Sequence, residues 1–385
     1  MKHRMTALLL ALLLTLTPLP VRAAEPEAAG PDVTAPAAVL MERATGTLLF
    51  EKNAHEALPP ASVTKVMTLL LVLEALDEGR IGWDDTVTAS EAAAAKGGSQ
   101  IYLEPGEGLP LREMLKSVAV ASANDCACAL AEHVAGSEAA FVDRMNRRAA
   151  ELGMADTHFV NCTGLDDGPD AAAHRTSAHD IALMSRALLA HDEIRDYTTI
   201  WMDSVRDGRF GLANTNKLIR FYPGATGLKT GYTSRAGYCL SASAERGGVE
   251  YIAVVLDCAS SADRFSDAKV LLDYGFANYA LVTPEAETAT VPVRLGMAPE
   301  AEAVLQDAGP LLLPKGDAAR AEQEAELTES VEAPVEAGQR LGTLRIRSGE
   351  AVVAELPLVA AAPVPRLTFW ESAKRVLRAA VGASV

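Results

Sequence analysis

The sequence predicts a mixed α/β (α+β) protein in which an antiparallel sheet is flanked by helices, followed by a small all-β domain and a C-terminal amphipathic helix. Hairpin signals near both ends of residues 35–281, with helical segments between them, predict the sheet and its helices. Short strand-like runs separated by Gly and Pro predict the all-β domain over residues 282–365. Residues 366–385 place apolar and basic side chains on opposite faces of a helix.

Length and composition describe a globular chain of about two domains. Of its 385 residues, 49% are hydrophobic and 22% charged, without the depletion of apolar residues that is typical of disorder. With 51 acidic against 35 basic residues the formal net charge is −16, which argues against nucleic acid as a partner, because phosphate binding needs Lys and Arg. Five cysteines without a C-x-x-C pair predict neither a disulfide framework nor a zinc site, so we expect no metal and no cofactor.

The N-terminus has the pattern of a secretory signal peptide over residues 1–23. A basic start precedes an apolar run at 8–14, and small residues follow where a signal peptidase would cut. The run is too short to span a bilayer comfortably, although a retained membrane anchor is the alternative. Residues 24–34 are expected to be a flexible lead-in. Export would allow disulfides, and Cys239 and Cys258 flank a predicted hairpin and could face each other, but we expect all five cysteines to be buried free thiols.

The elements of the first unit follow from local patterns. Strand-like residues on either side of 45–47 predict a hairpin over 38–51, which the Pro pair at 59–60 ends. Ser62 then opens a run that is apolar on nearly every side, which predicts a helix buried all round. Two β-rich runs, at 236–245 and 249–258, predict a second hairpin. Further helices are expected at about 110–121, 124–135, 138–152, 178–190 and 265–280.

The second unit and the tail have different compositions. Strands are expected at 291–295, 339–346 and 351–358, and the acidic run 317–336 is interpreted as a solvated face or loop. In the tail, one helical face carries the apolar side chains of Phe369, Trp370, Ala373, Val376, Leu377, Ala380 and Val381. The other face carries Glu371, Lys374, Arg375 and Arg378. This pattern predicts a helix that lies on an anionic membrane surface, and a terminal helix packed on its own domain is the alternative.

Ser62-Val63-Thr64-Lys65 lies where the chain enters the buried helix. The three-residue spacing puts the hydroxyl and the amine on one helical face, within reach of each other. Free backbone N–H groups and the dipole at a helix start favour negative charge that develops there. A serine nucleophile needs a nearby base, and a lysine can serve where burial and a second cation lower its pKa. Ser62 and Lys65 are therefore a candidate nucleophile and base.

Two further polar motifs have ordinary structural interpretations when taken alone. Ser122-Ala123-Asn124 stands between two predicted helices, where such residues are favoured helix caps. Lys229-Thr230-Gly231 could be a polar turn before the strand at 236. It is no phosphate loop, because Leu228 stands where that loop has Gly. His174 and His179 are five residues apart, which fits no zinc motif, so both are expected to be structural.

In the order S-x-x-K, S-x-N, K-T-G, the three motifs together resemble those of the penicillin-binding, active-site-serine D-Ala-D-Ala carboxypeptidases of low molecular mass. Residues 61–68, 161–165, 215–218 and 227–233 resemble that family as well. The resemblance covers residues 36–280, and the β domain and the amphipathic tail match the family's layout. It implies a β-lactamase/transpeptidase-like fold for residues 35–281.

The resemblance also implies catalytic roles. Ser62 would be the acylated nucleophile and Lys65 its general base. Ser122 and Lys229 would pass the proton to the leaving D-alanine, while Asn124 would hold the substrate amide. One departure is Ala123, where family members often carry Gly, and the added methyl is one that the pattern tolerates.

Substrate binding is implied for five further positions. The backbone N–H groups of Ser62 and Tyr232 would form an oxyanion hole. Gly231 would allow a peptide to approach the strand closely, as an added edge strand. Thr230, Thr233 and Arg264 would meet the terminal carboxylate.

The implied substrate is a peptidoglycan stem peptide ending in D-Ala-D-Ala, and β-lactam antibiotics would be covalent inhibitors. The implied location is the cell envelope, with the exported protein peripheral on the outer face of the cytoplasmic membrane through residues 366–385. A serine β-lactamase-like hydrolase is one alternative, but it needs a Glu four residues before an Asn, and Thr157 holds that position relative to Asn161. The other is a non-catalytic penicillin-binding wall scaffold, which requires a broken motif, whereas all three are intact.

Overall fold

The structure is a computed structural model, and it describes residues 30–286, 289–306 and 309–380. The predicted signal peptide and most of the lead-in lie outside these ranges. Export by this segment therefore stays a prediction.

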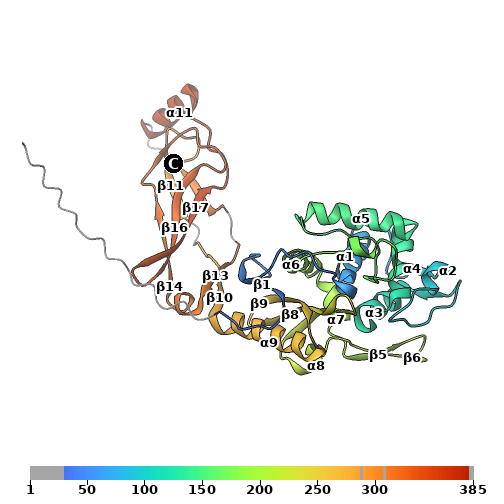
Figure 1. Cartoon of the computed structure of the whole chain (residues 1–385). Helices are drawn as coiled ribbons and strands as arrows, with labels where there is room; N and C mark the ends of the chain where they lie inside the picture. The colour runs from blue at the N-terminus through green and yellow to red at the C-terminus, as the bar shows by residue number, and fades with distance from the viewer. Residues whose placement is uncertain (1–29, 287–288, 307–308, 381–385) are drawn as a thin grey trace, which may run out of the picture.

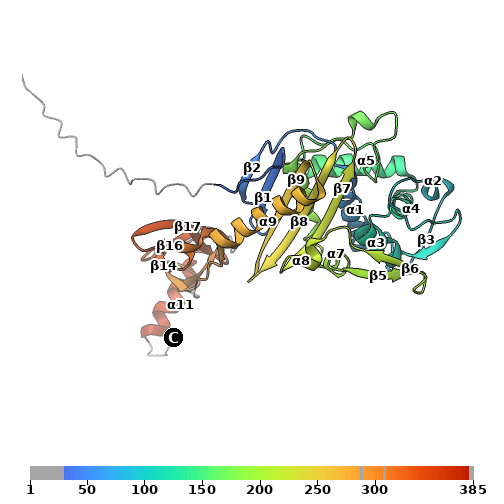
Figure 2. The same cartoon turned by 60° about the horizontal axis from the view of Figure 1, so that its bottom comes forward.

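A five-stranded antiparallel sheet forms the centre of the first unit, with strand order β2-β1-β9-β8-β7 (Figure 2). Both predicted hairpins are confirmed, as β1–β2 and β8–β9. The strands are β1 (Ala37–Glu42), β2 (Leu48–Lys52), β7 (Ala225–Thr233), β8 (Gly237–Arg246) and β9 (Val249–Cys258). No bounds were predicted for strand β7, which contains Lys229-Thr230-Gly231 and places it at an edge of the sheet. The motif is therefore not a polar turn before the strand at 236.

Both faces of this sheet are buried, because period-two alternation sends side chains to opposite sides. On one face Val39 and Met41 join a core built with the helices α1 (Lys65–Asp77) and α6 (Ala178–Leu188). On the other face Ala38 and Leu40 pack in a core with α9 (Ser261–Asn278). Helix α1 is buried along nearly its whole length, as its apolar pattern predicts. Each buried Leu or Val side chain contributes about 1.5–3 kcal/mol.

The other predicted helices are present within a few residues of the expected bounds: α3 (Leu111–Ala121), α4 (Asn124–Ala135), α5 (Glu138–Glu151) and α6. Helix α9 begins earlier than predicted because the side chain of Ser260 caps it by accepting from the Asp263 N–H. Several short elements were not predicted. They are α2 (Glu91–Ala94), α7 (Arg195–Thr198), α8 (Leu218–Phe221), the 3₁₀ turns η1 (Ala61–Thr64), η2 (Ala171–Ala173) and η3 (Asp192–Ile194), and the hairpins β3 (Thr86–Thr88) with β4 (Gly108–Pro110) and β5 (Met202–Val205) with β6 (Phe210–Ala213).

The second unit is built on a six-stranded sheet of order β14-β16-β17-β12-β11-β15, and it stands beside the first unit at the end of α9 (Figure 1). The three predicted strands are confirmed as β11 (Ala289–Arg294), β16 (Arg340–Ser348) and β17 (Ala351–Ala360). The sheet also contains β12 (Glu300–Leu305), β14 (Ala321–Leu327) and β15 (Val331–Glu332). A separate pair, β10 (Tyr279–Val282) with β13 (Leu311–Pro314), follows α9, and the short helix α10 (Lys315–Ala318) comes after it.

The acidic run is a solvated face, as predicted, but part of it is also an edge strand. Most side chains of β14 are exposed. Its glutamates form ion pairs with the arginines of β16. Glu326 Oε2 lies 2.5 Å from Arg345 Nη1, and Glu324 Oε2 lies 3.8 Å from Arg347 Nε. These charges stand on the outer edge of the sheet, where they oppose pairing with another chain.

The tail forms helix α11 (Phe369–Ala380) at the end of the second unit that lies away from the first (Figures 1 and 2). Its apolar side chains are exposed: Phe369 by 77%, Trp370 by 73%, Val376 by 70% and Leu377 by 68%. Val381 lies outside the described residues. No helix within the described ranges has the length and apolar character needed to cross a bilayer.

All five cysteines are buried and free, which confirms the expectation of free thiols. Cys239 belongs to the core on the α1 side of the sheet, whereas Cys258 belongs to the core on the α9 side. The two thiols are therefore separated by the sheet and do not form a disulfide.

Candidate active site

Ser62 and Lys65 are in direct contact, with the Lys65 Nζ donating to Ser62 Oγ at 2.7 Å. The turn that carries Ser62 is the 3₁₀ turn η1, which runs into α1 at Lys65. With three residues per turn, a 3₁₀ helix aligns the side chains at i and i+3 more closely than an α-helix does. The S-x-x-K spacing thus has the geometric result that the sequence predicted.

Burial changes the chemistry of the Lys65 amine. The side chain is 0% exposed, and its Nζ donates a second hydrogen bond to the Thr163 carbonyl oxygen at 2.9 Å. Loss of hydration lowers the pKa of Lys65 to about 7, against the opposing attraction of Cys162 and Asp125. A large fraction of the amine is neutral at neutral pH, so it can accept the serine proton.

The second motif lies at the junction of α3 and α4. Ser122 ends α3 in the left-handed region, with φ of 64°, and Asn124 begins α4. Asn124 donates from Nδ2 to the Gly97 carbonyl at 2.7 Å. Its Oδ1 is buried and has no hydrogen-bond partner within the described part of the chain. An unpaired buried acceptor is costly, which makes this oxygen available to a substrate N–H.

The third motif is buried on β7. Lys229 is 1% exposed and donates to the Thr230 carbonyl at 2.9 Å. Burial, then the charges of Lys65 and Arg264, hold the pKa of Lys229 well below its usual range. Lys229 and Lys65 are therefore electrostatically coupled, each disfavouring the charged form of the other.

Close backbone packing holds the turn of Ser62 between two glycines. A Cβ on Gly231 would lie 2.6 Å from the Pro60 carbonyl oxygen and 3.2 Å from the Ser62 nitrogen. A Cβ on Gly164, where φ is +82°, would overlap the Ala61 carbonyl. The sequence explained Gly231 by the approach of a peptide, but the described contacts show that the nucleophile turn itself already requires glycine there.

The candidate carboxylate-binding residues differ in their partners. Thr230 Oγ1 donates to Thr215 Oγ1 at 2.7 Å, and Thr233 Oγ1 accepts from the Ala236 N–H at 3.0 Å. Tyr232 is 54% exposed and stacks on Tyr238 with ring centroids 4.3 Å apart. Thr230 therefore joins β7 to the segment of Thr215, Thr233 stabilises the turn between β7 and β8, and Tyr232 faces solvent.

Arg264 reaches the same strand from α9. Its Nη1 donates to the carbonyl oxygens of Gly231, at 2.9 Å, and Cys239, at 3.4 Å. The buried Nε has no partner among the described residues. In this arrangement the guanidinium binds the backbone of β7 and β8, so direct contact with a substrate carboxylate stays a prediction.

The turn at 161–165 contributes to the site in a way that the sequence did not predict. Asn161 Oδ1 accepts from the N–H groups of Thr163, at 3.1 Å, and Gly164, at 2.7 Å. This turn presents the Thr163 carbonyl to Lys65. Asn161 and Gly164 belong to the segment that resembles the family, so the sequence did mark this turn. It could not show the contact with Lys65, because the group that binds Lys65 is a backbone oxygen, which every residue type has.

His174 contacts the turn that carries Ser62, and its role there is structural. His174 Nε2 lies 2.8 Å from Thr64 Oγ1, and the Val160 N–H donates to its Nδ1 at 3.1 Å. Burial lowers the pKa of His174 to about 4, so the ring is neutral. His179 has its own partner, Asp180, at 3.3 Å.

The fold and the site together define a serine acyl-transfer enzyme of the penicillin-binding type, with a lysine beside the nucleophile. The family model for D-alanyl-D-alanine carboxypeptidase matches residues 22–260, and that for the penicillin-binding protein 5 C-terminal domain matches residues 276–366. The chain belongs to the D-alanyl-D-alanine carboxypeptidase family of serine peptidases.

Relatives of known sequence and structure cover one or both units. D-alanyl-D-alanine carboxypeptidase DacF of Bacillus subtilis is 42% identical over 350 residues, which cover 89% of each chain. Penicillin-binding protein 5 from Haemophilus influenzae is 28% identical with a TM-score of 0.77, over 87% of this chain and 99% of that one. Penicillin-binding protein D2 from Listeria monocytogenes, solved in an ampicillin-bound form, is 34% identical with a TM-score of 0.58, over 63% of this chain and 98% of that one.

Proposed function

We propose that the protein removes the terminal D-alanine from peptidoglycan stem peptides that end in D-Ala-D-Ala, through an acyl-enzyme on Ser62. One observation carries the proposal: the Lys65 amine lies 2.7 Å from Ser62 Oγ, with its pKa lowered to about 7 by burial. A hydroxyl paired with a largely neutral amine is an activated nucleophile. The family and the names of the relatives supply the substrate class.

Acylation begins when Ser62 Oγ attacks the carbonyl carbon of the penultimate D-alanine while Lys65 Nζ takes the hydroxyl proton. The negative charge on the carbonyl oxygen is held by the backbone N–H groups of Ser62 and Tyr232. The C–N bond then breaks, and the proton held by Lys65 passes by way of Ser122 and Lys229 to the leaving amine, which leaves Lys65 neutral. D-alanine departs and the remaining peptide is an ester on Ser62.

Deacylation uses water in place of the leaving amine. The water attacks the ester carbonyl carbon and gives its proton to the neutral Lys65 amine. The ester C–O bond breaks, Ser62 Oγ recovers a proton, and the shortened peptide leaves as a carboxylate. A β-lactam would acylate the same oxygen by opening of its ring, which agrees with the ampicillin-bound form of the Listeria protein.

Substrate orientation is assigned to the polar groups that surround this pair. The unpartnered Oδ1 of Asn124 would accept from the substrate amide N–H. Thr230, Thr233 and Arg264 would hold the terminal carboxylate, with Arg264 acting at least partly through the backbone of β7.

The β-lactamase-like alternative has less support. It needs a carboxylate to activate water for deacylation. At the corresponding place, Thr157 Oγ1 is bonded to Thr176 Oγ1 and Asp180 Oδ2, both at 2.7 Å. A wall scaffold without catalysis is disfavoured by the contact between Ser62 and Lys65.

The proposed location is the cell envelope, on the outer face of the cytoplasmic membrane. The pattern of residues 1–23 supports export. The exposure of Phe369, Trp370, Val376 and Leu377 supports attachment to a membrane surface through α11, because a helix packed on its own domain would bury such side chains.

The proposed function is tested with the purified chain, a D-Ala-D-Ala pentapeptide and a fluorescent penicillin. We expect D-alanine release and one labelled peptide, the one containing Ser62. Ser62→Ala should abolish both while leaving the circular dichroism spectrum and the melting temperature close to those of the parent, because only one oxygen is lost. D-alanine release by a well-folded Ser62→Ala protein would contradict the mechanism.

A further inference from the structure

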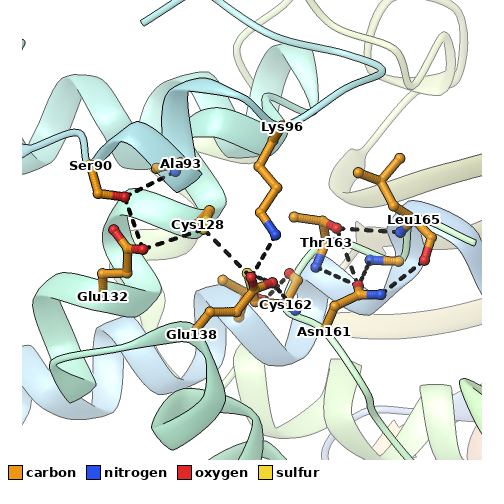
Figure 3. Close-up of polar contacts among 12 residues, drawn as sticks. Ser90, Ala93, Lys96, Cys128, Glu132, Glu138, Asn161, Cys162, Thr163 and Leu165 are labelled. Carbon is orange, nitrogen blue, oxygen red and sulfur yellow. Dashed lines mark hydrogen bonds and ion pairs between the residues drawn. The ribbon is translucent and has the colours of Figure 1, made fainter. Parts of the chain in front are cut away.

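Two buried thiols and a carboxylate converge between α4, α5 and the turn before Thr163 (Figure 3). Cys128 comes from α4, Glu138 from the first turn of α5, and Cys162 from the turn at 161–165. Their ligand atoms all lie within 4.8 Å of one another. Both cysteines are 0% exposed, whereas the Glu138 side chain is 23% exposed.

The distances within this cluster match those between ligands around one metal ion. Cys162 Sγ lies 3.2 Å from Glu138 Oε1, and Cys128 Sγ lies 3.7 Å from Glu138 Oε2. In a tetrahedral zinc site, metal–sulfur and metal–oxygen bonds of about 2.3 and 2.0 Å place sulfur and oxygen ligands about 3.5 Å apart. Because all three ligand atoms lie within 4.8 Å of one another, small movements of these side chains would bring them to bonding distance of a central ion.

The carboxylate of the cluster is accessible and already binds a cation. The Lys96 Nζ lies 2.5 Å from Glu138 Oε2 and makes the ion pair seen in Figure 3. Lys96 and Glu138 line a cavity of about 440 Å³ that also borders Asn161, Thr163 and Leu165. This cavity gives access to the Glu138 carboxylate, and the two thiols are buried behind it.

We propose that Cys128, Glu138 and Cys162 bind a thiophilic divalent cation such as Zn²⁺, with the Lys96 ammonium occupying the carboxylate when the metal is absent. On binding, each thiol loses its proton and the two thiolates and the carboxylate coordinate the ion, so two protons are released for each ion bound. The Lys96 side chain moves away into the cavity, and a fourth ligand comes from water or from Glu132, whose Oε1 lies 3.9 Å from Cys128 Sγ. The sequence did not predict this site because its ligands come from three separate segments with no metal-binding spacing.

The site is joined to the catalytic turn by the backbone. The Cys162 carbonyl accepts from Thr68 Oγ1 at 2.7 Å, and the next residue, Thr163, presents its carbonyl to Lys65 at 2.9 Å. An ion coordinated by Cys162 together with Cys128 of α4 and Glu138 of α5 would fix the turn at 161–165. That turn positions the Lys65 base. Metal binding should raise the melting temperature, because a ligand that binds only the folded chain stabilises it.

The test is a direct metal titration that does not depend on activity. The full chain is stripped of metal with a chelator under a non-thiol reductant, then titrated with Zn²⁺ against a chromophoric chelator. Titration with Co²⁺ reports thiolate ligands by their charge-transfer absorption. We expect one ion per chain, the thiolate band, and a Zn²⁺ affinity reduced by more than about 100-fold in Cys128→Ala and in Cys162→Ala.

Three variants separate this site from adventitious binding. Cys126→Ala changes a buried thiol on the same helix outside the cluster and should bind Zn²⁺ as the parent does. Glu138→Gln keeps the size of the side chain and should weaken binding. Lys96→Gln removes the competing ammonium and should strengthen binding by about tenfold. The last variant gains function, so its result cannot come from misfolding.

Three results of the titrations would overturn the proposal. They are an absence of stoichiometric Zn²⁺ binding in the folded parent chain, unchanged affinity in folded Cys128→Ala and Cys162→Ala, and weaker binding in Lys96→Gln. A disulfide between Cys128 and Cys162 in the protein isolated from cells with its thiols alkylated would also overturn it, because the ligands would then be consumed.

Discussion

The residue that determines the proposed chemistry is Lys65, and its environment matters more than its identity. An exposed lysine is protonated at neutral pH and cannot act as a base. Here complete burial beneath the Ser62 turn lowers the pKa to about 7, and the Thr163 carbonyl fixes the direction of the amine. The S-x-x-K spacing predicted the contact with Ser62 but not the Thr163 contact, because backbone groups leave no signal in a sequence.

The lowered pKa of Lys65 predicts the pH dependence of acylation. Below pH 7 the amine is mostly protonated and cannot accept the Ser62 proton, whereas above pH 7 it is mostly neutral. The second-order rate constant for acylation by a penicillin should therefore rise about tenfold per pH unit on the acidic side and level off above about pH 7. Stopped-flow measurements between pH 5 and 9, with the fold checked at each pH, would show this limb.

Lys65→Arg is the matched control for this prediction. It keeps a cation at the site but removes the titratable base, since arginine stays protonated at every working pH. We expect acylation to fall by at least about 100-fold, with no rise through pH 7. An arginine variant with the parent's rate and pH profile would assign the base to another group.

At the scale of elements, the site depends on how closely β7 approaches the turn η1. Gly231 on β7 lies against Pro60 and Ser62 with no room for a Cβ. Arg264 of α9 donates to the Gly231 carbonyl oxygen and so holds the same strand in place. The sequence placed Gly231 correctly in a motif of the sheet, but the reason for glycine became clear only from tertiary packing. Likewise, strands β10, β13 and β15 are too short to show the period-two pattern that predicts a strand. Strand β14 was not predicted because its many charged residues are typical of a solvated loop.

Gly231→Ala should displace the Ser62 nucleophile without unfolding the chain. The added methyl would lie 2.6 Å from the Pro60 carbonyl oxygen, so the turn that carries Ser62 must shift by several tenths of an ångström. Misplacement of a nucleophile on this scale costs up to about 100-fold in rate. We expect acylation by penicillin to slow by about 10- to 100-fold while the chain still folds, as circular dichroism and thermal melting would confirm.

The control is Gly211→Ala on β6, where a Cβ meets no atom within 4 Å and the backbone angles suit any residue. This variant should acylate at the parent's rate. Equal rates for the parent and folded Gly231→Ala would mean that η1 tolerates displacement, and would refute the argument from close packing.

At the scale of the molecule, the sequence predicted the order of parts: a helix-covered sheet, a β domain and an amphipathic end. It could not predict how the parts are joined, because β10 and β13, which follow α9, pair over a long separation in sequence. The structure adds that α11 lies at the far end of the β domain with its apolar side chains uncovered. Its position would hold the catalytic unit away from any surface to which α11 binds.

Truncation after Leu367 tests this proposed attachment. The shortened chain keeps the bridge between Gly296 and Arg366 and the 2.8 Å hydrogen bond from the Leu367 N–H to the Leu295 carbonyl. The β domain should therefore stay intact, with a melting temperature within about 2 °C of the parent's. Activity on soluble peptides should also be unchanged. A helix packed on its own domain would instead lower the melting temperature when removed.

Binding is measured by co-sedimentation with vesicles of anionic or neutral lipid. Phe369, Trp370, Val376 and Leu377 should enter the acyl boundary, while Lys374 remains near the lipid phosphates. Arg375 donates to the Met297 carbonyl oxygen at 2.6 Å and joins α11 to the β domain. The full chain should sediment with anionic vesicles and dissociate in high salt, since the surface potential decays within a Debye length of about 10 Å at ordinary ionic strength. Val376→Ser should weaken binding, whereas Val352→Ser, which changes a 43% exposed valine on β17, should not. If the full and truncated chains sediment equally on anionic lipid, α11 is not the anchor.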